Sequence, residues 1–158
     1  IWQVGPSHQD NYGVYSSDRI KVLPFVDDMG AFYAATDLVV SRAGALALAE
    51  IAACGKPSLL IPYAGAAGDH QSKNAESLRA AGAATILKQR VLNGERLATE
   101  IKSLINNTVA LERMASAAKA VSKPDAAIQI VEEIERIAII CCLGRLKKYI
   151  SSVLVELE

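Results

Sequence analysis

The chain has 158 residues, of which 51% are hydrophobic and 22% charged, a composition typical of one globular domain with an apolar core. This apolar content excludes an intrinsically disordered chain. Lysine plus arginine equals aspartate plus glutamate at 17 residues each, so no net charge attracts the whole chain to nucleic acid, and none is expected as a partner.

Short β-branched runs alternate with longer helical stretches along the chain. This order is typical of βαβ units and predicts an α/β fold, a mostly parallel sheet with helices on both faces. The predicted strands are residues 2–4, 20–25, 38–40, 58–61 and 84–87. The predicted helices are residues 29–35, 45–54, 70–81, 94–106, 110–121 and 124–142.

Two features of the predicted helices can be checked directly. Asp69 stands where an N-cap for the helix over 70–81 is expected. The last predicted helix has apolar residues at helical spacing, which predicts one buried face. That face consists of Ala127, Val131, Ile134 and Ala138.

The three cysteines, Cys54, Cys141 and Cys142, indicate a reduced, cytosolic protein that uses them as small apolar residues. Two of them are adjacent and no C-x-x-C pair or histidine cluster occurs, so no metal site is predicted. The longest apolar run, residues 137–143, is too short to span a membrane, and no signal peptide is recognised. The start at Ile1 without a methionine suggests a fragment of a longer protein.

Ligands of open parallel sheets bind beyond the carboxyl ends of the strands, which selects three loops: residues 24–29, 41–45 and 63–71. The second loop leads directly into a helix, and backbone N–H groups there suit a phosphate. The alternative is that Gly44 and its alanine neighbours only allow close packing of helix on sheet. No G-x-G-x-x-G or G-x-x-x-x-G-K-[ST] pattern occurs, which argues against a dinucleotide site or a P-loop.

Three polar side chains near these loops are candidates for ligand contacts. Glu50 is the only charged residue between Arg42 and Lys56. Its carboxylate faces solvent, is paired, or accepts hydrogen bonds from a ribose diol. Gln71 is expected at the crevice mouth, where an amide suits sugar hydroxyls. His70 could act as a base, although a histidine at a helix start is more often a capping or surface residue.

Together the three loops resemble the MurG family, bacterial transferases that move N-acetylglucosamine (GlcNAc) from UDP-GlcNAc to a polyprenyl-diphosphate-linked acceptor, lipid I, to form lipid II in peptidoglycan synthesis. The resemblance runs from about residue 1 to about residue 137. Its motifs are residues 23–29 (LPFVDDM), 35–45 (ATDLVVSRAGA), 50–52 (EIA), 55–57 (GKP), 61–62 (IP) and 69–75 (DHQSKNA).

The resemblance implies the C-terminal, donor-binding half of a GT-B glycosyltransferase, a hexosyltransferase that inverts the anomeric centre without metal or cofactor. Residues 1–142 would form a Rossmann-like UDP-GlcNAc-binding domain without its first strand and glycine-rich loop, and residues 143–158 a tail of unknown role. The acceptor site, the catalytic base and the membrane-contacting surface would belong to an N-terminal domain. Without that domain the chain would have no catalytic residue and would be inactive alone. The full-length protein would lie at the cytoplasmic face of the inner membrane as a peripheral protein.

The resemblance also implies substrate-binding residues. Val26 would contact the uracil edge through its backbone, between Phe25 and Met29. Other residues would contact the sugar, the diphosphate and the ribose. Glu50 would bind the ribose hydroxyls, Gln71 the GlcNAc hydroxyls, and the remaining predicted contacts are Gly44, Ala45, Leu46, His70 and Asn74.

Two alternatives remain open on the sequence. One is a free-standing donor subunit that pairs with a separate membrane subunit to act on a polyprenyl-diphosphate sugar. The other is a nucleotide-sugar binding module without catalysis of its own.

Overall fold

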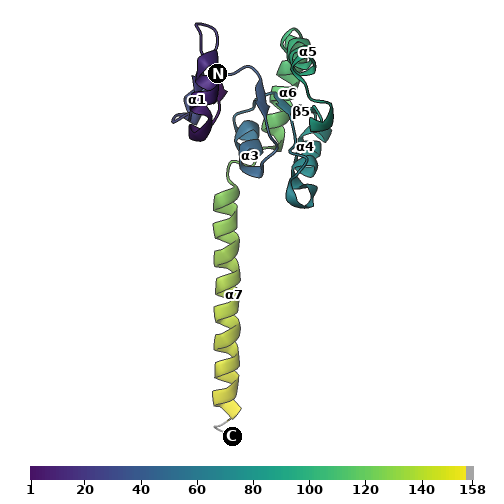
Figure 1. Ribbon diagram of the computed structural model, residues 1–158. Coiled ribbons are helices and arrows are strands. Elements are labelled where there is room, and N and C mark those ends of the chain that lie inside the picture. The colour runs from purple at the N-terminus through teal and green to yellow at the C-terminus, as the bar shows by residue number, and fades with distance from the viewer. Residues whose placement is uncertain (156–158) are drawn as a thin grey trace. The chain divides into compact units, whose positions relative to one another are not determined.

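Five short strands in two parallel sheets form the framework of residues 1–122 (Figure 1). In one sheet β1 (Trp2–Gln3) pairs with β2 (Val22–Leu23). The other has the order β3 (Val39–Ser41), β4 (Ser58–Leu60), β5 (Ala84–Ile86), with both neighbouring pairs parallel. All five predicted strands are confirmed; four are shorter than predicted, and β3 has the predicted length but begins and ends one residue later.

The computed structural model describes the backbone of residues 1–155 and the side chains of residues 1–140, and it divides the chain into two units, Ile1–Ser122 and Lys123–Glu158. Helices follow the strands at the predicted places. They are α2 (Met29–Ala34), α3 (Ala45–Ala53), α4 (His70–Ala80), α5 (Gly94–Ile105) and α6 (Thr108–Val121), with α7 (Ala126–Val155) in the second unit.

The three-stranded sheet carries an apolar layer on each face. On one face Leu60 and Ala84 pack with residues of α2, α3 and α4, such as Tyr33, Ile51 and Ala75. On the other face Leu59, Ile61 and Leu87 pack against a stripe of α5 formed by Leu97, Ile101 and Leu104. Residues on both faces are buried, as expected for a parallel sheet covered by helices on both sides, and the predicted α/β fold is confirmed.

Residues 6–15 form short helices that the sequence did not predict. They are η1 (Pro6–His8), α1 (Gln9–Tyr12) and η2 (Gly13–Tyr15). Trp2 packs on this segment, with its ring centroid 5.0 Å from that of Tyr12. Because each helix is only three or four residues long, no apolar periodicity marks it in the sequence.

Asp69 stands at the expected N-cap position of α4, but it does not cap the helix through its side chain. Asp69 has a left-handed backbone with φ of 54°, and its side chain makes no capping hydrogen bond. Gly68 before it is also left-handed, with φ of 60°. An N-cap residue normally has an extended backbone, and the turn formed by Gly68 and Asp69 instead directs the carboxylate to the wall of a cavity.

The second unit differs from its prediction in two respects. The predicted helix over 124–142 continues to Val155, so its expected end at Cys142 is wrong. The expected buried face is also wrong, since Val131 is 54% and Ile134 is 60% exposed. Helical periodicity identifies an apolar stripe but not the surface that would cover it. The side chains of Cys141, Cys142 and residues 143–158 lie outside the described residues.

Candidate functional site

Two side chains of α4 hold the loop that follows β3. Gln71 Oε1 accepts hydrogen bonds from the backbone N–H groups of Ala43, at 3.3 Å, and Tyr63, at 3.0 Å. Asn74 Nδ2 donates to the carbonyl oxygen of Ala43 at 3.2 Å. Ala43 is fully buried, so the two bonds to its N–H and C=O satisfy groups that water cannot reach. Gln71 and Asn74 therefore fix the loops after β3 and β4 to the start of α4.

In this arrangement the amide oxygen of Gln71 accepts hydrogen bonds, and its amide nitrogen takes no part. Among the hydrogen bonds of the described side chains, none uses Gln71 Nε2 as a donor. Gln71 is half-buried, so part of its side chain is exposed. The predicted place of Gln71 at the crevice mouth fits this geometry, while its role in holding two loops was not foreseen.

Gly44, Ala45 and Leu46 form the start of α3, directly after the loop that Gln71 and Asn74 hold. Gly44 is the N-cap residue with an extended backbone, φ −69° and ψ 141°, and no side chain caps the helix. Ala45 and Leu46 are exposed, Leu46 to 82%. The first N–H groups of α3 thus lack a side-chain acceptor at an accessible helix start, as a bound anion requires.

Glu50 lies six residues further along α3, about 9 Å from Gly44 at 1.5 Å per residue. Its Oε2 accepts a hydrogen bond of 3.3 Å from the hydroxyl of Tyr33 on α2. Tyr33 is buried, and this burial together with the charge of Glu50 raises its pKa from 10 to about 12. Of the three sequence alternatives for Glu50, two hold together: the residue is exposed, and its Oε2 is paired with Tyr33. Among the hydrogen bonds of the described side chains, none uses Oε1.

The raised pKa of Tyr33 predicts a loss of stability in alkali. The neutral phenol is favoured in the folded chain, so its contribution is fully present below pH 10 and is lost as the pH rises from 10 through 12. Chemical denaturation between pH 9 and 12 should show this decline for the unsubstituted chain and a smaller decline for Tyr33→Phe. An equal decline in both would show that Tyr33 ionises normally.

Three further predicted contacts belong to the loop before α2 and the first residue of that helix. Phe25 is 58% exposed, whereas Val26 is buried and Met29 packs against the core at the first residue of α2. The backbone N–H of Val26 donates to Gln3 Oε1 at 3.1 Å. The N–H group of Val26 is already bonded to Gln3, so a ligand that hydrogen-bonds to the Val26 backbone would do so at its carbonyl oxygen.

His70 stands apart from the other candidates. Its Nδ1 lies 2.6 Å from the carbonyl oxygen of Ala67 in its own loop, and its side chain is exposed. No hydrogen bond of the described residues joins it to Gln71 or to the loop at Ala43. This contact matches the capping or surface role that the sequence analysis considered more common than a base.

A second polar network was not predicted from the sequence. Arg42 Nη1 donates to the carbonyl oxygen of Ile61 at 3.1 Å and to Gln89 Oε1 at 2.9 Å, and its guanidinium lies 5.7 Å from the ring centroid of Tyr63. Gln89 Oε1 also accepts from the N–H of Ala64 at 3.3 Å. The position of Arg42 directly after β3 predicts that it lies in a loop. Nothing in the sequence predicts its hydrogen bond to Gln89.

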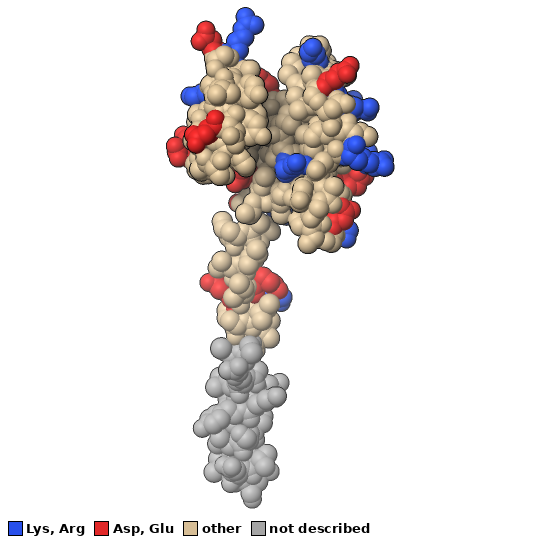
Figure 2. All heavy atoms as spheres, in the orientation of Figure 1, with Lys and Arg blue, Asp and Glu red and all other residues tan. Residues whose placement is uncertain are grey.

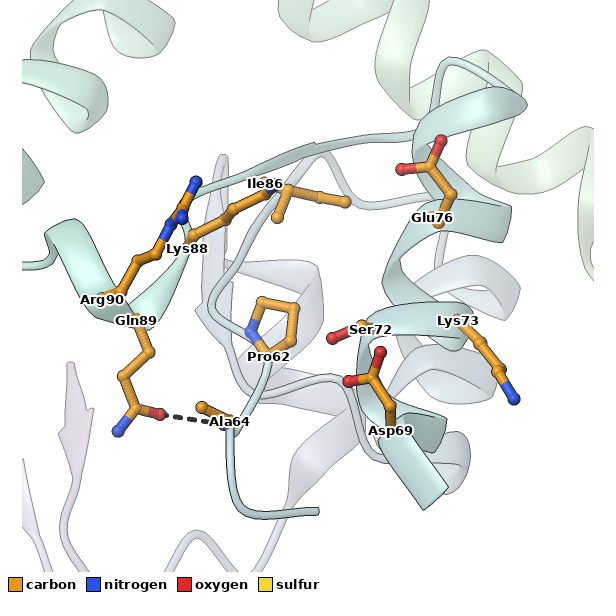
Figure 3. Close-up of a pocket in the computed structure, with 10 residues that line it drawn as sticks. All are labelled: Pro62, Ala64, Asp69, Ser72, Lys73, Glu76, Ile86, Lys88, Gln89 and Arg90. Carbon is orange, nitrogen blue, oxygen red and sulfur yellow. Dashed lines mark hydrogen bonds between the residues drawn. The ribbon is translucent and has the colours of Figure 1, made fainter. Parts of the chain in front are cut away.

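A cavity of about 750 Å³ opens on the other side of α4 (Figure 3). Its walls come from the carboxyl ends of β4 and β5, including Pro62 and Ile86, and from Ser72, Lys73 and Glu76 of α4. None of the predicted substrate contacts lines it. Gln71 and Asn74 face Ala43, so α4 separates this cavity from the predicted site, and Gln89 contributes to both the cavity wall and the Arg42 network.

Within the part of the chain that the structure describes, no cluster of three or more histidine, cysteine or acidic side chains could hold a metal ion. Over the same residues, no helix combines the length and the apolar character needed to cross a bilayer.

Known proteins share this arrangement of strands and loops. The glycosyltransferase family 28 C-terminal domain matches residues 1–130, most of the chain. The chain belongs to this family. The family 28 match covers all ten predicted contacts, from Phe25 to Asn74.

Similar proteins are transferases from bacteria. The chain is 50% identical over 111 residues to the UDP-N-acetylglucosamine–N-acetylmuramyl-(pentapeptide) pyrophosphoryl-undecaprenol N-acetylglucosamine transferase of Anaeromyxobacter sp. (strain K), covering 70% of this chain and 29% of that protein. It is 41% identical over 147 residues to the transferase of the same name from Shewanella loihica, covering 89% of this chain and 38% of that protein. The family 28 chain thus spans about a third of the length of these relatives.

Solved structures agree with the family assignment. The MurG crystal structure from Acinetobacter baumannii superimposes with a TM-score of 0.78 and 33% identity, over 85% of this chain and 40% of that one. The glycosyltransferase VinC, at 20% identity and a TM-score of 0.64, shares the fold. The chain is therefore a Rossmann-like C-terminal domain of the GT-B type, as the sequence predicted.

Proposed function

We propose that this chain is the UDP-GlcNAc-binding part of an inverting glycosyltransferase that transfers GlcNAc to lipid I to form lipid II. The observation that carries the proposal is the alignment of three groups along one edge of the sheet. These are the accessible start of α3, the free oxygen of Glu50 and the free amide nitrogen of Gln71. They match three parts of a nucleotide sugar, namely the diphosphate, the ribose diol and the sugar. The names of the bacterial relatives support this donor and acceptor.

Each predicted residue has a part in this proposal. Uracil lies against Phe25 and Met29, with the carbonyl of Val26 accepting from the base. The N–H groups that follow Gly44, those of Ala45 and Leu46, bind the diphosphate. Glu50 binds the ribose, Gln71 Nε2 donates to a GlcNAc hydroxyl, and Asn74 acts indirectly by holding Ala43. His70 lies at the rim of the sugar site, where its contact with Ala67 limits it to a secondary role.

The chemistry that these residues supply is leaving-group stabilisation and orientation. Displacement at the anomeric carbon inverts it and transfers negative charge to the departing UDP. The partial positive charge at the start of α3 stabilises that charge, and neither metal nor cofactor is needed for it. The acceptor, the catalytic base and the contact with the membrane lie in the part of the protein outside residues 1–158, so this chain alone binds donor without turnover.

We extend the same proposal to domain bounds and location. Residues 1–142 form the donor domain, and residues 143–158 form a tail to which no role is assigned. The whole protein works as a peripheral protein on the cytoplasmic face of the inner membrane, where a polyprenyl-linked acceptor is accessible.

Calorimetric titration with nucleotides tests the proposal. We expect UDP and UDP-GlcNAc to bind more tightly than ADP, because the loop at Phe25–Met29, with the carbonyl of Val26, is the proposed uracil site. Titrations at one salt concentration separate base recognition from charge, since UDP and ADP carry the same diphosphate. Equal affinities for UDP and ADP would contradict the assignment of the base site.

A further inference from the structure

Gln3 joins the end of β1 to the loop before α2. It is the last residue of β1, and the N–H groups on either side of it, those of Trp2 and Val4, donate to the carbonyl oxygens of residues 21 and 23 at 2.7 and 2.9 Å. Its side-chain Oε1 accepts the hydrogen bond of 3.1 Å from the N–H of Val26. The side chain of Gln3 is therefore held at its backbone and at its amide.

Strand geometry directs this side chain away from the short helices of residues 6–15. Side chains of consecutive strand residues point to opposite faces of a sheet. The ring of Trp2 packs against Tyr12 on one face, so the side chain of Gln3 lies on the other. Because β1 and β2 are parallel, the end of β1 and the loop after β2 lie at the same edge, where ligands of parallel sheets bind.

The hydrogen bond to Val26 also orients the amide of Gln3. A backbone N–H group only donates, so the amide atom that faces it is the oxygen, and Nε2 takes the other position. Gln3 is exposed, and among the hydrogen bonds of the described side chains none uses its Nε2. Since Nε2 and Oε1 are bonded to the same carbon atom, this donor lies next to the Val26 backbone.

The two pyrimidine bases differ at two neighbouring positions. Uracil has a donor at N3 and an acceptor at O4, whereas cytosine has an acceptor at N3 and a donor at its 4-amino group. The carbonyl of Val26 and the Nε2 of Gln3 match uracil at both positions and cytosine at neither. We propose that Gln3 recognises the base, with Nε2 donating to O4 of uracil and excluding cytosine. This inference rests on the proposed UDP-GlcNAc site and adds to it a residue of β1 that selects the base.

Calorimetric titration of UDP and CDP at pH 7 measures this selection. The two nucleotides have the same ribose and diphosphate, so the ratio of their Kd values depends on the base alone. Charged side chains of both signs are spread over the face of residues 1–122 in Figure 2, and both nucleotides meet the same charges. We expect the unsubstituted chain to bind UDP more tightly than CDP.

Two substitutions of Gln3 separate its two amide atoms. Gln3→Leu removes the donor without adding charge and should reduce the preference for UDP over CDP about two- to tenfold, the equivalent of one neutral hydrogen bond. Gln3→Glu retains an oxygen for the Val26 N–H and replaces Nε2 with a second oxygen, which accepts from the 4-amino group of cytosine and repels O4 of uracil. Gln3→Glu should therefore reduce the preference further than Gln3→Leu. Its added charge weakens both nucleotides and cancels in the ratio.

Other outcomes overturn the proposal. An unchanged ratio in both variants would mean that Gln3 only holds Val26. A ratio that rises in Gln3→Leu would mean that the freed N–H of Val26 itself donates to O4. If Gln3→Leu does not fold, Gln3→Glu, which retains the acceptor for Val26, decides the question alone. Absence of any UDP binding to the unsubstituted chain would overturn the donor site together with this role of Gln3, whereas tight UDP binding with an unchanged ratio would overturn only the role of Gln3.

Discussion

Glu50→Ala should raise the Kd for UDP roughly ten- to hundredfold, the equivalent of about 1.5–3 kcal/mol for hydrogen bonds to a charged group. The exposed oxygen of Glu50 is the proposed ribose acceptor. Isothermal titration of UDP against the variant and the unsubstituted chain measures the change. Unchanged binding would remove Glu50 from the donor site.

The same substitution should also destabilise the fold, contrary to what the sequence alone suggests. An isolated carboxylate in an exposed helix position could be replaced by alanine, the better helix former, at little cost. Here the buried hydroxyl of Tyr33 would lose its acceptor, and we expect a loss of about 1–3 kcal/mol. The double variant Glu50→Ala/Tyr33→Phe removes both partners and should recover most of this stability while its UDP binding stays weak. Recovery of UDP binding in the double variant would mean that Glu50 acts only through Tyr33.

Gln71→Ala should have the second large effect, in two separable parts. Loss of Oε1 leaves the N–H groups of Ala43 and Tyr63 without their acceptor, so we expect the free energy of unfolding to fall by about 1–3 kcal/mol. The loops around the start of α3 then loosen, and both UDP and UDP-GlcNAc should bind less tightly. Loss of Nε2 removes the sugar contact, so the preference for UDP-GlcNAc over UDP should decrease several-fold in addition, as expected for about 1 kcal/mol.

Asn74→Ala is the matched control, since it removes another bond to Ala43 without removing a proposed sugar contact. Asn74→Ala should weaken the binding of UDP and of UDP-GlcNAc by the same factor. Titrations of the two ligands against both variants, with denaturant unfolding of each, separate the roles. An unchanged ratio in Gln71→Ala would make Gln71 a positioning residue only.

Local signals in the sequence sufficed for most of the framework. Strands appeared where β-branched runs meet turn residues, and Gly82, with φ of 80°, ends α4 by providing its left-handed turn. The places of Glu50, Gln71 and Gly44 relative to the strand ends follow from the βαβ order alone. The proposed ligand came from the family resemblance, because the spacing of apolar residues carries no information about ligands.

The partners of these residues could not be predicted, because they depend on contacts between distant parts of the chain. Gln71 bonds to Ala43 across 28 positions, and Arg42 to Gln89 across 47. Asp69 occupies the N-cap position that its residue type favours, yet its left-handed backbone, which the residue type does not predict, accompanies a side chain without a capping hydrogen bond. Short helices over residues 6–15 contain too few residues to show a period.

The two glutamine oxygens, Gln71 Oε1 and Gln89 Oε1, each accept from groups on two different loops. Loops tied in this way before a ligand arrives lose little conformational entropy when it binds, and immobilising even one free side chain costs about 0.5–1.5 kcal/mol. Contacts that are individually weak can then still bind a ligand, because little of their free energy is lost to ordering the loops. Both glutamines link the loop after β3 to the loop after β4 through these hydrogen bonds. We therefore expect a substitution of Gln89, which lines the cavity beside α4, to alter the loop that ends at Gly44. If the proposed nucleotide site is correct, we therefore expect substitutions at Gln89 to change the dissociation rate of UDP without touching it.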